Sequence, residues 1–116
     1  MSTKQTGDAG EELACTFLKR QGFKILERNF RIRGGEIDIV AKDREDLVFV
    51  EVKTRYSHNF GAPAEAVTSR KVNFLIRASQ FYLAKHKMFE KPYRIDVVAV
   101  DFTDGQKIEH IKNITS

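Results

Sequence analysis

The spacing of apolar residues divides this chain into two helical and five extended segments. Apolar positions recur every three or four residues over residues 8–21, and again from Thr68 or Ser69 onward, as expected for helices with one buried face. Runs of β-branched and aromatic residues predict strands at 23–30, 35–42, 47–54, 94–102 and 107–111. The predicted order of elements is therefore α-β-β-β-α-β-β.

The second predicted helix is long enough to connect two parallel strands of one sheet. Gly22 follows the first helix at the position of a C-terminal stop, and Thr68 or Ser69 has the side chain of an N-terminal cap for the second. These features predict an α/β fold with helices flanking a mixed central β-sheet. The apolar stripe of the second helix comprises Val72, Leu75, Ile76, Ser79, Tyr82 and Leu83.

A hairpin connects the second predicted strand to the third. Residues 43–46 suit a four-residue loop, which pairs Lys42 with Leu47. Side chains alternate between the two faces of a strand, so this register decides which charged residues oppose each other.

In this register four charged residues share one face of the hairpin. Asp38 lies opposite Glu51, and Glu36 lies opposite Lys53. Opposed Cβ atoms are about 5 Å apart and like charges there destabilise, while an unpaired buried carboxylate is costly. A divalent cation between Asp38 and Glu51 would turn the repulsion into ligation, and Mg²⁺ prefers carboxylate oxygens and water. The pattern predicts a metal-dependent phosphodiesterase site.

Length and composition fit one domain spanning residues 1–116. Hydrophobic residues make up 41% and charged residues 31%, and the net charge of +4 mildly favours anionic partners. No apolar run approaches the ~20 residues that cross a membrane, and residues 1–10 lack a signal-peptide pattern, so we expect a cytoplasmic protein without membrane contact. Cys15, the only cysteine, excludes intramolecular disulfides, and we expect it to be buried.

Asp38 followed by Glu51-Val52-Lys53 resembles the PD-(D/E)XK nuclease signature, with Ile37 where that name has proline. Further motifs together resemble the YraN-like family of small bacterial proteins, and the resemblance covers nearly the whole chain. That family is similar in layout to archaeal Holliday junction resolvases. The resemblance implies a nuclease domain with a restriction-endonuclease-like core. Its motifs are Gly10-Glu11-Glu12-Leu13-Ala14, Gly35-Glu36-Ile37-Asp38, Phe49-Val50-Glu51-Val52-Lys53-Thr54-Arg55, Phe60-Gly61 and Arg94-Ile95-Asp96-Val97-Val98.

The resemblance also implies roles for individual residues. Asp38 and Glu51, with Glu11 from the first helix as a third carboxylate, are the expected ligands of Mg²⁺, with Mn²⁺ as a substitute. Lys53 is expected to orient or deprotonate the attacking water, which makes Asp38, Glu51 and Lys53 the catalytic residues. Glu36 has no counterpart in the resolvases and is a candidate accessory carboxylate. The implied function is a metal-dependent endonuclease acting on nucleic acid, with branched DNA favoured, and a homodimer, because two symmetric cuts need two sites.

Structural interpretations of the same residues stay open. Glu36 and Lys53 can form a cross-strand salt bridge worth up to about 1 kcal/mol. Glu11 can simply favour the N-terminal end of its helix. For Asp96, within an apolar strand, we expect a structural pairing with Arg94 or a helix residue.

A non-catalytic nucleic-acid-binding module is the main alternative function, and a protein-assembly role is a third. In the binding module, basic residues would contact phosphates and aromatic residues would stack on bases, although we expect Phe60 and Phe74 to be core residues. The candidate phosphate contacts are Arg31, Arg33, Arg55 and Lys71, with Arg44, Arg70 and Arg77 as further cations.

Overall fold

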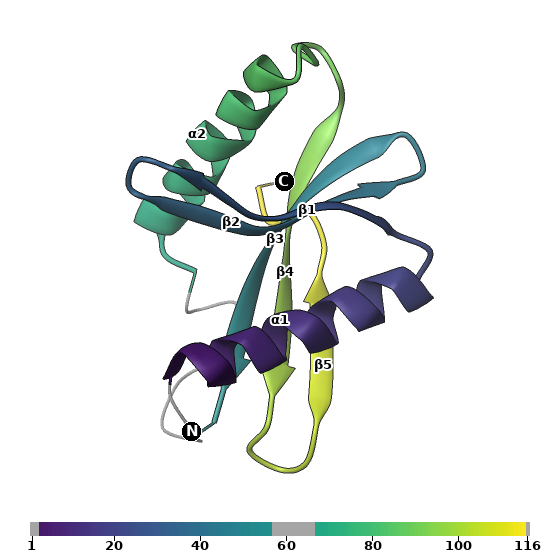
Figure 1. The fold of residues 1–116 in the computed structure, drawn as a ribbon, viewed down its shortest axis with the longest axis vertical. Helices are drawn as coiled ribbons and strands as arrows, with labels where there is room; N and C mark the ends of the chain where they lie inside the picture. The colour runs from purple at the N-terminus through teal and green to yellow at the C-terminus, as the bar shows by residue number, and fades with distance from the viewer. Residues whose placement is uncertain (1–2, 57–66, 116) are drawn as a thin grey trace.

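The computed structural model describes residues 3–56 and 67–115, with side chains from residue 9 onward (Figure 1). The predicted order of elements, α-β-β-β-α-β-β, is confirmed. The elements are α1 (Thr3–Arg20), β1 (Lys24–Ile32), β2 (Gly35–Asp43), β3 (Asp46–Arg55), α2 (Ser69–Lys85), β4 (Tyr93–Asp101) and β5 (Lys107–Ile111).

The five strands form one mixed sheet in the order β1-β2-β3-β4-β5. β3 and β4 are parallel, and the other neighbouring pairs are antiparallel. Because parallel neighbours need a long connection, α2 is the crossover between β3 and β4, as its length predicts. The expected α/β class with a mixed sheet is therefore confirmed.

The two helices cover opposite faces of the sheet (Figure 1). On one face, Ala14, Cys15 and Leu18 of α1 pack on β-branched residues of β2, β3 and β4, and Cys15 is buried as expected. On the other face, α2 packs on Phe49 and its neighbours through Phe74, Leu75, Ala78, Tyr82 and Leu83. Over residues 3–56 and 67–115, neither helix combines the length and apolarity needed to cross a membrane.

The helix ends follow local signals in the sequence. After α1, the N–H of Phe23 donates to the carbonyl of Leu18 and that of Gly22 donates to Lys19, which is a Schellman ending around Gly22. At α2, the Thr68 hydroxyl accepts from the N–H of Lys71, so Thr68 is the cap. α1 begins at residue 3 instead of the predicted residue 8. Its first residues are polar, so the helical spacing of apolar residues does not extend to them.

The turns between β1 and β2 and between β2 and β3 are shorter than predicted. The register between β2 and β3 pairs Lys42 with Leu47, as expected, but Asp43 also pairs with Asp46, so the loop has two residues instead of four. Arg44 has a φ of 58°, which suits a tight hairpin turn. β1 likewise continues to Ile32, which packs against the α2 side of the core and leaves a turn of residues 33–34.

β2 and β3 part from each other halfway along their length. Their pairing ends at Ile39 and Val50, while β2 continues beside β1 to Gly35 and β3 continues beside β4 to Arg55. The predicted opposition of Glu36 and Lys53 is therefore wrong, because Glu36 pairs with Arg31 on β1 instead. Ile37 packs on the α2 side and Ile39 on the α1 side, so β2 turns about its axis where it leaves β3.

Candidate metal centre

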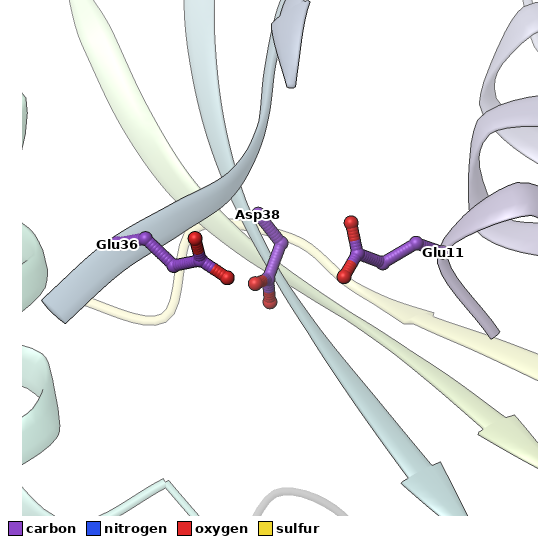
Figure 2. Close-up of side chains that lie close together, drawn as sticks. All are labelled: Glu11, Glu36 and Asp38. Carbon is purple, nitrogen blue, oxygen red and sulfur yellow. The ribbon is translucent and has the colours of Figure 1, made fainter. Parts of the chain in front are cut away.

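Three carboxylates meet where β2 leaves β3. Glu36 and Asp38 come from β2 and Glu11 comes from α1, and Figure 2 shows the three side chains pointing toward one another. One oxygen of each lies within 4.8 Å of the others, and all three residues are half-buried. Like charges gathered this closely repel, so the arrangement favours a cation among them.

Close packing of α1 on β3 brings Glu11 to this place. A Cβ on Gly10 would collide with the hydroxyl oxygen of Thr54, so only glycine allows the helix to lie this near the strand. Glu11 is the next residue in the helix, and its Oε1 accepts a hydrogen bond of 2.9 Å from Asn29 Nδ2. Arg28 lies 3.7 Å from the same oxygen. The carboxylate is thus held from both α1 and β1.

Asp38 lies at the point where β2 leaves β3, which we call the fork. Its Oδ2 accepts a hydrogen bond of 2.8 Å from the N–H of Val52, a backbone group that β2 no longer pairs beyond Val50. Burial, followed by hydrogen bonding and charge repulsion from the Glu51 carboxyl, raises the pKa of Asp38 to about 9. The Val52 N–H opposes this rise and Glu11 adds to it. Without a cation, Asp38 therefore keeps its proton near neutral pH.

Glu51 is more deeply buried than the other three carboxylates. Its side chain is 5% exposed, and Oε2 lies 3.0 Å from the ammonium of Lys71 at the start of α2. Within the described part of the chain, that oxygen has no hydrogen-bond partner of good geometry, so the contact with Lys71 is purely ionic. A buried acceptor without a hydrogen bond is unusual and often marks a missing ion or water.

The ion pair between Lys71 and Glu51 was not predicted from the sequence, because Lys71 was expected to contact nucleic acid. One signal was available: the first turn of α2 carries cations and no acidic residue, against the usual preference of helix N-termini. Lys53 lies two residues beyond Glu51 on β3, on the same face, and is half-buried. Among the described residues it makes no ion pair.

The basic residues predicted to contact nucleic acid lie on the strands and turns around the fork. Arg31 donates to Glu36 over 3.0 Å from an exposed position on β1, and Arg33 is exposed in the β1–β2 turn. Arg55 ends β3, where its carbonyl accepts from the N–H of Phe102. Phe74 is buried, as expected. Phe60, expected in the core, lies outside the described residues.

The donor set fits a hard divalent cation. Mg²⁺ and Mn²⁺ take carboxylate oxygens together with water, and the fork offers four carboxylates from two strands and one helix. Glu11, Glu36 and Asp38 lie close enough to share an ion, and Glu51 faces Asp38 from the other strand. Glu36, expected only as an accessory, thus lies among the nearest candidate ligands.

Comparison with known proteins places the chain among close relatives. A family model described as "Uncharacterised protein family UPF0102" matches residues 10–100. A UPF0102 protein of Geobacter metallireducens is 50% identical over 97% of this chain and 93% of its own length. Another from Dehalococcoides mccartyi is 45% identical over 95% and 92%. The solved structure of Pyrococcus furiosus SfsA in complex with Ca²⁺ aligns over 97% of this chain and 64% of its own, at 13% identity and a TM-score of 0.36, a likeness too low to support an argument.

Proposed function

This chain belongs to the UPF0102 family, in agreement with the YraN-like family that its motifs resemble, and we propose that it is a nuclease. The carboxylate site indicates that its activity depends on a divalent cation. The observation that carries the proposal is the gathering of Glu11, Glu36 and Asp38 beside Glu51 at the fork. The reaction is hydrolysis of phosphodiester bonds within nucleic acid, with DNA as the favoured substrate. Membership of the PD-(D/E)XK superfamily is part of this proposal.

The carboxylates hold the cation and Lys53 acts on the water. Glu11, Asp38 and Glu51, with Glu36, are the residues that would bind Mg²⁺ or Mn²⁺. A bound divalent ion supplies Lewis-acid polarisation of the phosphoryl group and a water of lowered pKa. Lys53 lies at the open end of the same strand face as Glu51, where an ammonium orients water and stabilises developing negative charge.

The raised pKa of Asp38 adds a second support. Since the pKa of Asp38 is raised to about 9, binding of a cation must displace the proton that Asp38 holds. Cation binding is then accompanied by proton release near neutral pH. A purely structural pair of carboxylates has no comparable reason to be kept at this cost.

Cleavage assays with site variants test the proposal. Labelled linear, flap and four-way-junction DNA, and single-stranded RNA, are incubated with Mg²⁺, Mn²⁺ or EDTA. We expect cation-dependent cleavage by the wild type, loss of cleavage in Asp38→Asn, and a reduction of about 10²-fold in Lys53→Ala, the size typical for removal of one charge-stabilising group. Glu109→Gln, an exposed carboxylate on β5, is the matched control and should cleave like the wild type.

Two outcomes would contradict this proposal in different ways. Full cleavage by Asp38→Asn would show that the fork is not the reacting site. Absence of cleavage with every substrate and cation, together with binding that weakens as salt rises, would favour the non-catalytic binding module instead.

A further inference from the structure

A second, cationic hollow lies beside the carboxylates, between the β1–β2 turn and the first turns of α2. Its volume is about 560 Å³. Arg70, Lys71 and Arg77 line it together with Gly34, Thr68 and Phe74, and none of the described residues that line it carries a carboxylate. In Figure 1 the tip of the β1–β2 hairpin lies next to the starting end of α2. The hollow therefore lies between the turn that leads into β2, the strand of Glu36 and Asp38, and α2, whose Lys71 contacts Glu51.

A buried ring holds two of these cations in place. Lys71, Phe74 and Arg77 are three residues apart and so lie on one face of α2. The Lys71 ammonium is 5.1 Å and the Arg77 guanidinium 5.5 Å from the centre of the Phe74 ring, within cation–π range. The ring packs closely on Gly35, where an added Cβ would lie 2.9 Å from it. The cations are thus positioned before any ligand arrives.

These charges are unfavourable for the protein itself. The N-terminal end of a helix carries partial positive charge, which disfavours cations there, and the first turn of α2 has no acidic residue to compensate. Among the side chains of residues 9–56 and 67–115, no carboxylate pairs with Arg70 or Arg77. Cations at the start of a helix without a carboxylate partner go against the local preference, which indicates a functional site, and an anion would satisfy them.

Lys71 connects the hollow to the metal centre. Its ammonium lines the hollow and also lies 3.0 Å from Glu51, whose carboxyl interacts with Asp38. An anion in the hollow would therefore lie one side chain away from the carboxylates. A chain of regularly spaced phosphates is the ligand that places one anion here and another at the fork.

We propose that this hollow binds a backbone phosphate of the nucleic-acid strand, next to the phosphodiester at the carboxylates, through Arg70, Lys71 and Arg77. The proposal rests on the function proposed above, since it takes the same substrate. Arg70 and Arg77 are the residues to test, because neither contacts the carboxylates and both are exposed. Their guanidinium groups match the geometry of phosphate oxygens.

Binding in the absence of cleavage tests the hollow by itself. Fluorescence anisotropy in EDTA measures the affinity for labelled single strands of DNA and RNA about 20 nucleotides long, and for duplex DNA, between 50 and 200 mM salt. In the double variant Arg70→Gln/Arg77→Gln we expect at least tenfold weaker binding and a salt slope lower by about one to two, on every nucleic acid that the wild type binds. Lys24→Gln/Lys107→Gln removes two exposed charges from other edges of the sheet and should change binding less than threefold.

The results separate this proposal from the one on which it rests. If Arg70→Gln/Arg77→Gln binds like the Lys24→Gln/Lys107→Gln control, the hollow is not a phosphate site, whatever the cleavage assay gives. If the double variant loses binding while the wild type never cleaves, the hollow stands and hydrolysis is refuted. A thermal melt identical to that of the wild type excludes misfolding as the cause of lost binding.

Discussion

At the scale of single residues, the cost of gathering carboxylates shows most clearly at Asp38. Its pKa of about 9 means that the folded protein binds this proton far more tightly than the unfolded chain, whose aspartates titrate near 4. Ionised Asp38 is therefore unfavourable in the cation-free fold. Under the proposed function, a bound cation would relieve this cost.

A pH prediction follows for Asp38. Because its folded pKa is raised, the free energy of unfolding should fall as pH increases from about 4 to about 9. Asp38→Asn keeps an acceptor for the Val52 N–H but has no charge, so its stability should decline less over this window and exceed that of the wild type at pH 9. Urea unfolding in EDTA at pH 5, 7 and 9 measures this, with Glu109→Gln as the control that follows the wild type. An equally steep decline in Asp38→Asn would refute the raised pKa of Asp38.

At the scale of elements, two arrangements form the centre. β2 leaves β3 after Ile39, which frees the N–H of Val52 for Asp38, and α1 approaches β3 closely enough at Gly10 to bring Glu11 into reach. Neither strand nor helix has the site alone. A shift of α1 by the width of one methyl group should therefore separate Glu11 from the other carboxylates.

Gly10→Ala tests this approach of helix to strand. In a helix position with free space, the change would raise stability by about 1 kcal/mol through helix propensity. Here the new Cβ meets Thr54, so we expect a loss of about 1–3 kcal/mol and about tenfold weaker Mn²⁺ binding by calorimetry. The variant Gly10→Ala/Thr54→Ala removes the obstructing hydroxyl and should recover part of both losses. A more stable Gly10→Ala would show that the helix has room to spare.

At the scale of the whole molecule, a buried ionic network joins distant parts of the chain at Asp96. Its carboxylate accepts from Arg94, from the N–H of Asn113 and, at 2.8 Å, contacts Nε2 of His110. Arg94 also pairs with Asp43 at the β2–β3 turn. The expected structural role of Asp96 is therefore confirmed, with His110 and the C-terminal segment as partners that sequence reasoning did not name.

Asp96→Asn should destabilise the fold as a whole. Burial by itself raises the pKa of Asp96, but the hydrogen bonds from His110, Asn113 and Arg94 outweigh it, and the pKa is lowered. Removing the charge leaves Arg94 buried without it, for which we expect a loss of about 3 kcal/mol at neutral pH. Because the folded pKa is lowered, this contribution exists above pH 4 and disappears in more acidic solution. Urea unfolding at pH 7 and pH 3 should show the difference between variant and wild type shrinking with acid.

Much of the fold was predictable because its signals are local. The apolar period, the stop at Gly22, the cap at Thr68 and the pairing of Lys42 with Leu47 each depend on residues near one another in the chain. Asp38 and Glu51 interact through their side chains as expected, because one short hairpin joins them, but they do not oppose each other in the sheet, since the pairing of β2 and β3 ends at Ile39 and Val50. Turn lengths were less predictable, because strands gain or lose a residue at little cost.

The partners of Glu36 and Glu51 depend on contacts that no local pattern contains. Alternation along a strand predicts faces but not the residue at which β2 leaves β3, so it gave Glu36 the wrong neighbour. The ion pair of Glu51 with Lys71 requires the start of α2 to pack beside β3, which follows from the burial of Phe74 against Gly35. Sequence thus establishes the elements and the residue types available for chemistry, whereas packing between distant segments establishes which charges meet.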